Sequence, residues 1–142
     1  MSIRNKVGAA VAATVAAVGM GTVAAPSAAA APAWDNDTYY VCSYYCSWGY
    51  ASGGIIWGNR TATVQGSVTD VSGDHTTVYF DAFAGATKVD SETRTAAYET
   101  KSYNFSIGDP NLVGGIDRIR IQVCTTVGTV RYCGPQENEI RD

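Results

Sequence analysis

Few side chains in this sequence are suited to nucleophilic, acid–base or metal chemistry. It has one histidine, His75, in the turn-like stretch SGDHTT, and four cysteines, Cys42, Cys46, Cys124 and Cys133. A tetrahedral zinc site needs four Cys or His donors, usually with two residues between paired cysteines. Here three residues separate one pair and eight separate the other. We therefore expect no metal site and no other cofactor.

The candidate catalytic residues form no recognisable pattern. The sequence lacks a Ser in a G-x-S-x-G context, and we expect His75 to be a solvated turn residue rather than a general base. A pair of carboxylates suited to glycoside hydrolysis is left open, because distances across a sheet cannot be seen in a sequence. We predict no catalytic residues and a non-enzymatic protein. Most of the available carboxylates fall in turns or on the outward side of predicted strands; they are Asp70, Asp74, Asp81, Asp90, Glu92, Asp109 and Asp117.

Residues 1–30 are predicted to be a secretory signal peptide. Arg4 and Lys6 precede an uncharged run from Val7 to Ala25, and small residues offer cleavage sites near residues 28–33. A membrane anchor is the alternative, because the run is nearly long enough to span a bilayer. Cleavage leaves one domain with eight basic and thirteen acidic residues, a net charge of −5. We expect such a chain to bind neither nucleic acid nor an anionic membrane.

Four cysteines in a small exported chain indicate two disulfides. The stretch CTTVGTVRYC predicts a hairpin with a type II′ turn at Gly128-Thr129, which places Cys124 opposite Cys133 at a non-hydrogen-bonded pair. In a straight strand Cys42 and Cys46 would lie about 13 Å apart, which is too far for a disulfide. We expect the chain to bend and close a local Cys42–Cys46 ring. The alternative is an extended segment whose cysteines pair with the other two.

Past residue 58 the apolar residues recur at every second position, which is the period of a β-strand. In IDRIRIQVC, Ile119, Ile121 and Val123 are predicted to point inward, whereas Arg118 and Arg120 point outward. TATVQGSVTD, TTVYFDAFAG and YETKSYNFSIG alternate in the same way, and residues 88–94 do so more weakly. Turn sequences separate these runs, and no convincing amphipathic helix follows the signal. We predict an all-β fold, a small antiparallel β-sandwich of about six or seven strands over residues 58–142.

Tyr and Trp side chains are concentrated in residues 31–57, ahead of this sandwich. Glycines in GGIIWG separate that segment from the strand beginning near Thr61. The segment is either an N-terminal strand whose rings cap an open end of the sandwich, or a binding element, because Tyr and Trp are enriched at interface hot spots. The candidate partner-binding residues are Trp34, Tyr39, Tyr40, Tyr44, Tyr45, Trp48, Tyr50 and Trp57.

Three stretches carry a family resemblance: the Ala-rich signal ending AAAAPAW, WGNRTATVQGSVTD, and GGIDRIRIQVC followed by YCG. With them the chain resembles the small secreted β-sandwich proteins that actinobacteria export. In architecture, size and cysteine number it is also similar to the disulfide-bearing adaptor subunits of umbrella-shaped secreted toxin particles. Those subunits dock an extended N-terminal segment into a partner. This resemblance implies a protein-binding role and assigns no individual residues.

The function predicted from the sequence is that of a secreted, non-catalytic, adaptor-type protein. Its aromatic N-terminal segment would bind another secreted protein, either by adding a strand to a sheet edge or by docking into a cleft. The alternative is an extracellular carbohydrate-binding module, whose rings stack on a polysaccharide, or an enzyme-inhibitor module.

Overall fold

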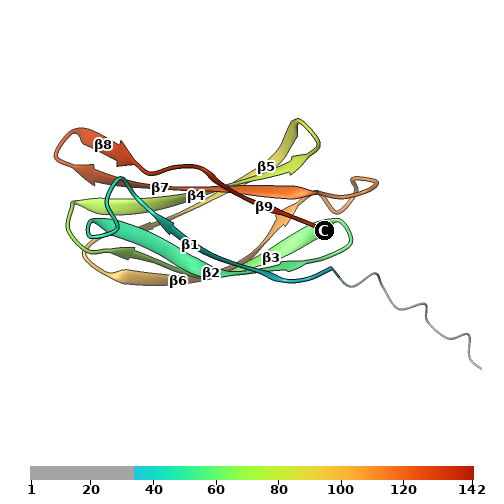
Figure 1. Cartoon of the computed structure of the whole chain (residues 1–142), viewed down its shortest axis with the longest axis horizontal. Coiled ribbons are helices and arrows are strands. Elements are labelled where there is room, and N and C mark those ends of the chain that lie inside the picture. The colour runs from blue at the N-terminus through green and yellow to red at the C-terminus, as the bar shows by residue number, and fades with distance from the viewer. Residues whose placement is uncertain (1–33) are drawn as a thin grey trace, which may run out of the picture.

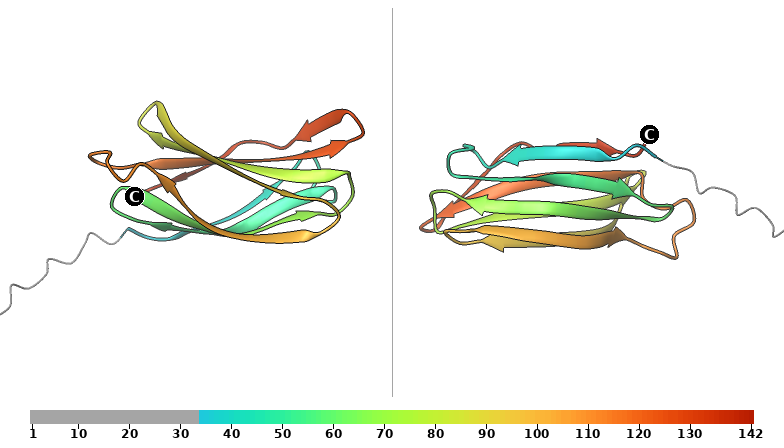
Figure 2. Two further views of the ribbon diagram at one scale, coloured as in Figure 1. Left: turned by 180° about the vertical axis from the view of Figure 1, so that it is seen from behind. Right: turned by 90° about the horizontal axis from the view of Figure 1, so that it is seen from below.

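The structure, a computed structural model, describes residues 34–142, so the predicted signal peptide lies outside the described residues. In this range the chain forms nine strands in two antiparallel sheets that pack face to face (Figures 1 and 2). The predicted all-β fold with two disulfides is confirmed. Seven of the nine strands lie within residues 58–142, in agreement with the prediction, and the aromatic segment supplies the other two.

The first sheet has four strands in the order β1-β2-β3-β6. They are β1 (Asp37–Cys42), β2 (Gly49–Trp57), β3 (Thr61–Asp70) and β6 (Thr100–Gly108). The aromatic segment therefore lies within the sandwich, paired along its length with the strand that follows it. Gly53 and Gly54 of GGIIWG lie inside β2, and Gly58 directly follows the end of that strand.

The second sheet is built around β7 (Arg118–Val127). One side of β7 pairs with β4 (His75–Ala84), which pairs in turn with β5 (Thr87–Ala96). The other side pairs with two short strands at opposite ends, β8 (Val130–Cys133) and β9 (Glu137–Ile140). The sequence of β9, ENEI, has no apolar alternation, so periodicity did not reveal this strand.

The hydrophobic core fills the space between the sheets with alternate residues of the strands. The inward positions predicted for β7 are confirmed, since Ile119, Ile121 and Val123 are fully buried. The predicted inward faces of β3 and β4 are buried as well. This burial of aliphatic and aromatic side chains is the main term that stabilises the sandwich.

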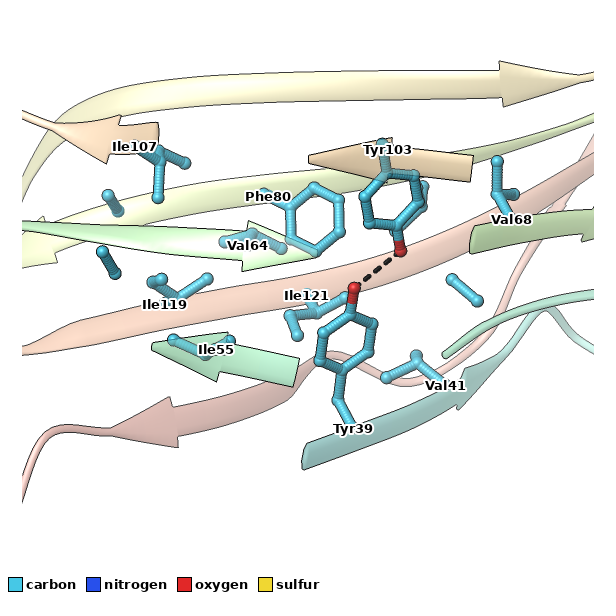
Figure 3. Packing of buried hydrophobic residues seen from close by; sticks show 14 of the residues in the cluster. Tyr39, Val41, Ile55, Val64, Val68, Phe80, Tyr103, Ile107, Ile119 and Ile121 are labelled. Atoms are coloured by element: carbon cyan, nitrogen blue, oxygen red, sulfur yellow. Dashed lines mark hydrogen bonds between the residues drawn. The ribbon is translucent and has the colours of Figure 1, made fainter. Parts of the chain in front are cut away.

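Two tyrosine hydroxyls meet in the middle of this core (Figure 3). Tyr39 comes from β1 and Tyr103 from β6, the two outer strands of the first sheet, and their Oη atoms lie 2.7 Å apart. Between them, Gly53 of β2 is paired with Gly66 of β3. A Cβ atom on either glycine would collide with the Tyr39 hydroxyl. Both glycines therefore leave the room that the hydroxyl pair occupies.

The outer faces of the two sheets differ in charge. On the second sheet, Asp81 lies 2.7 Å from Arg120 and 3.5 Å from Lys88. On the first sheet, the outward positions of the four strands carry no charged residue. We call this surface the hydroxyl face; its residues are Thr38, Tyr40, Cys42, Tyr50, Ser52, Gly54, Ile56, Thr61, Thr63, Gln65, Ser67, Thr69, Thr100, Ser102, Asn104 and Ser106.

Candidate functional site

The loop between β1 and β2 is closed by the Cys42–Cys46 disulfide, which confirms the predicted local ring. Its Cα atoms lie 4.7 Å apart, because the chain turns sharply after β1. Inside the loop, the Ser43 hydroxyl donates to the Tyr45 carbonyl at 2.9 Å, and Trp48 N–H donates to the same carbonyl at 3.0 Å. The loop is thus held by a covalent bond and by its own hydrogen bonds.

The rest of the protein anchors this loop from two sides. From the β3–β4 connection, Val71 N–H and Ser72 N–H both donate to the Trp48 carbonyl, at 2.9 and 3.1 Å. On the other side Gly134, just past β8, approaches the carbonyls of Cys42 and Ser43 so closely that a Cβ atom there would collide with them. The loop therefore has a defined position relative to both sheets.

Four aromatic rings pack together on this loop and the neighbouring strand. We call them the ring cluster: Tyr44, Tyr45 and Trp48 from the loop, and Tyr132 from β8. Ring centroids are 4.6 Å apart for Tyr44 and Tyr45, and 4.9 Å apart for Tyr45 and Trp48. Trp48 and Tyr132 are also 4.9 Å apart, and Tyr132 and Tyr44 are 6.3 Å apart, which closes the circuit. The three shortest contacts are edge-to-face, a preferred geometry for aromatic pairs.

The ring cluster is only partly covered by protein. Tyr44 is 59% exposed and Tyr45 is 52% exposed, whereas Trp48 and Tyr132 are half-buried. The cluster lies at the end of the sandwich where the β1–β2 loop and the β7–β8 hairpin lie (left in Figure 1). Of the ten large exposed hydrophobic side chains in residues 34–142, six are at this end: Tyr44, Tyr45, Val71, Tyr98, Val127 and Val130. Exposed apolar surface is therefore concentrated around the cluster.

The second disulfide sets the position of Tyr132. Cys124 pairs with Cys133 in the predicted hairpin register, with Cα atoms 4.0 Å apart, so this prediction is confirmed. Gly128 has a φ of 61° and Thr129 has a negative φ, as a type II′ turn requires. Sequence reasoning placed Tyr132 correctly in this hairpin but missed its role. No local pattern shows that the stapled loop packs against it.

Three of the predicted aromatic residues pack on the protein's own sandwich. Tyr39 is in the core, and Trp57 is 6% exposed with its Nε1 donating to Asp37 at 2.6 Å. Trp34 is half-buried against the core, and the Arg141 guanidinium lies 4.4 Å from its ring centroid. These three side chains therefore pack within the protein's own fold.

Tyr40 and Tyr50 lie on the hydroxyl face and pair with each other rather than with the ring cluster. Their rings are nearly parallel, with an interplanar angle of 29° and centroids 5.2 Å apart. Only Tyr44, Tyr45 and Trp48, of the eight predicted residues, come together at the stapled loop.

Two of the carboxylates considered as catalytic candidates, Asp70 and Asp81, make contacts that stabilise the fold. Asp70 is 5% exposed, unlike the solvated carboxylate we expected, and accepts hydrogen bonds from Thr76 Oγ1 at 2.7 Å and Tyr98 N at 2.9 Å. Partial burial of Asp81 opposes its ionisation, but hydrogen bonds from Arg120 and Ser91 lower its pKa below the usual value. These two carboxylates therefore satisfy hydrogen-bond donors and a cation of the sandwich.

Between residues 34 and 142 the structure contains no pocket and no group of three or more His, Cys, Asp or Glu side chains placed to hold a metal ion. The same range has no helix with the length and apolar character needed to cross a membrane.

Comparison with known proteins returned no match, either to a family model, to a curated protein or to a solved structure. The candidate site is therefore defined by the geometry of the ring cluster alone.

Proposed function

We propose that this protein is a secreted, non-catalytic, adaptor-type binding protein that holds a partner protein through its ring cluster. The observation that carries the proposal is the exposure of Tyr44 and Tyr45 on a loop that a disulfide and an aromatic circuit hold in place. Tyr and Trp residues provide most of the binding energy at many protein interfaces, because each buries a large area with few rotatable bonds.

The stapled loop also reduces the entropy that binding would cost. Immobilising a flexible side chain at an interface costs about 0.5–1.5 kcal/mol. In the ring cluster the side chains already restrain one another, and the Cys42–Cys46 bond restrains the backbone beneath them. A partner would therefore meet a surface that is already close to its bound conformation.

The ring geometry favours a protein partner over a sugar. Stacking on a sugar requires an open ring face, whereas the three shortest contacts within the cluster have interplanar angles of 76–84° and present ring edges as well as faces. Trp57, a natural candidate for sugar stacking, is buried. An inhibitor that inserts the same loop into an enzyme cleft remains a special case of the proposal, since its partner is also a protein.

Docking of the loop end is the binding mode we propose, rather than donation of β1. Donating β1 as a detached segment would need it to leave β2, to which it is paired over its whole length. It would also remove Tyr39 from the core and break its contact with Tyr103. The loop end can make contacts without any such rearrangement.

Secretion forms part of the proposal. Two disulfides, with no free cysteine among the described residues, are compatible with an extracellular protein. The signal-like residues 1–30 support the same location. The partner would accordingly be another secreted protein.

The proposal can be tested by recovering the protein, tagged at its C-terminus, from the culture supernatant of the cells that naturally produce it. We expect the wild-type protein to bring down a stoichiometric partner. Tyr45→Ala and Trp48→Ala should reduce recovery of that partner about 30-fold, the effect of losing about 2 kcal/mol at a hot spot. Tyr40→Ala is the matched control, because Tyr40 is as exposed as Tyr45 but lies outside the cluster.

Two results would contradict the proposal. One is recovery of the tagged protein alone, with the mass of a monomer. The other is a partner that Tyr45→Ala and Trp48→Ala recover as well as the wild type does.

A further inference from the structure

The hydroxyl face differs from the rest of the surface in having no charge. Charged residues make up 16% of the sequence, and the outer face of the opposite sheet carries Asp81, Arg118 and Arg120. An exposed sheet face without charged side chains is usually a liability, because charges keep such surfaces from associating. A face that four strands leave uncharged in a protein of net negative charge therefore requires an explanation.

The same face has a regular pattern of side chains. Along β3 its outward residues are Thr61, Thr63, Gln65, Ser67 and Thr69, and β6 continues the pattern with Ser, Thr and Asn. These side chains are short, and the Thr69 and Thr100 hydroxyls lie 2.9 Å apart across the two strands. From the spacing of strands and residues, the face measures about 30 Å by 15 Å. Along β3 and β6 it offers rows of hydroxyl and amide groups, and larger side chains, such as Tyr40 and Tyr50, lie on β1 and β2.

These properties indicate the chemistry of the ligand. Ser and Thr hydroxyls both donate and accept hydrogen bonds, so they complement a ligand that is itself rich in hydroxyls. A charged ligand would lose hydration without gaining an opposite charge on this face, which is unfavourable. We propose that the hydroxyl face is a second binding surface and that its ligand is a neutral polysaccharide.

Tyr40 and Tyr50 provide the apolar contact that such a ligand also needs. Sugar rings carry C–H groups on their faces, and surface aromatic rings cover them favourably. Tyr40 is 61% exposed, and its near-parallel contact with Tyr50 holds it on the face. This surface uses none of the four rings of the ring cluster, so it is independent of the proposed protein-binding site.

The test is retention of the purified protein on microcrystalline cellulose and on chitin, with carboxymethyl cellulose as the charged comparison. We expect retention on at least one neutral polymer, unchanged between about 0.05 and 0.5 M NaCl because no charges take part. Thr63→Lys, in the middle of the face, should reduce retention at least about tenfold by placing a long charged chain there. Tyr40→Ala should weaken it in the same direction.

Two matched variants keep the test specific. Thr93→Lys makes the same change on β5 of the opposite sheet, where Thr93 is exposed, and should leave retention unchanged. Tyr45→Ala should also leave it unchanged, which separates this surface from the ring cluster. Thermal unfolding of each variant checks that it is folded at the temperature of the retention assay.

Three outcomes would overturn the proposal. The first is no retention on either neutral polymer. The second is an equal loss of retention in Thr63→Lys and Thr93→Lys, or retention on carboxymethyl cellulose as strong as on the neutral polymers. The third is a dimer in light scattering that Thr63→Lys dissociates, because the face would then be covered by a second copy of the chain.

Discussion

The Tyr39–Tyr103 pair makes a quantitative prediction about stability in alkaline solution. Burial raises the pKa of Tyr39 far above its usual value, and its hydrogen bond with Tyr103 raises it further. Burial also raises the pKa of Tyr103, to about 12, against smaller opposing effects of Tyr39 and Arg94. In the unfolded chain both phenols would ionise near pH 10. The two tyrosines therefore contribute fully to the free energy of unfolding below about pH 10, and this contribution is lost as the pH rises further.

The size of the loss follows from these shifts. At pH 12 the ionisation of Tyr103 in the unfolded chain would lower the free energy of unfolding by about 2.3 kcal/mol, and that of Tyr39 by about 2.7 kcal/mol. The combined loss of about 5 kcal/mol is comparable with the whole stability of a small domain. We expect the wild-type protein to unfold near this pH.

Tyr39→Phe should separate the two contributions. At pH 7 the variant should be less stable by about 1 kcal/mol, because one buried hydrogen bond is lost. At pH 12 it should be more stable than the wild type by about 1.7 kcal/mol, because only Tyr103 still titrates. The two stability curves should cross between about pH 10 and 11. Urea unfolding followed by tryptophan fluorescence, from pH 7 to 12, measures both curves.

Tyr40→Phe is the control, since Tyr40 is exposed and its ring would be unchanged. Its stability curve should follow that of the wild type at every pH. Parallel curves for Tyr39→Phe and the wild type, with no crossing, would show that the buried pair does not govern alkaline unfolding.

Two further predictions concern the loop and the core. Replacing both Cys42 and Cys46 by Ser should lower the free energy of unfolding in urea by only about 2 kcal/mol, because the ring is small. The same change should weaken partner capture at a temperature where the variant is folded, and unimpaired capture would contradict a preorganised loop. Gly53→Ala should cost about 3 kcal/mol or more in a urea melt, since its Cβ would meet the Tyr39 hydroxyl and the β3 backbone. Gly54→Ala points outward and is the control; equal stability of the two variants would refute the role assigned to Gly53.

The features that could be predicted from the sequence depend on local geometry. The inward residues of β7 follow from alternation within one strand. The Cys124–Cys133 pair follows from counting outward from one turn, and the Cys42–Cys46 ring follows from the length of five residues. In each case the residues involved are close together in the chain.

The distribution of the aromatic side chains could not be predicted in this way. Tyr39 and Tyr40 point to opposite faces because they are adjacent in a strand, but the room for the Tyr39 hydroxyl in the core comes from glycines of β2 and β3. Trp57 is buried beside Asp37, twenty residues earlier in the chain. Tyr132 joins the ring cluster from the other sheet. These positions depend on contacts between distant segments, which composition and periodicity do not contain.

The contact between Trp34 and Arg141 has a consequence for how the protein can be displayed. It brings the first described residue against a residue one position before the end of the chain. The C-terminus and the start of the described chain lie at the end of the sandwich opposite the β7–β8 hairpin (Figure 1). A carrier or solid support joined at either place would hold the molecule with its aromatic end pointing outward. The same closeness would let a short linker join the two places, so that the chain could be reopened elsewhere as a circular permutant.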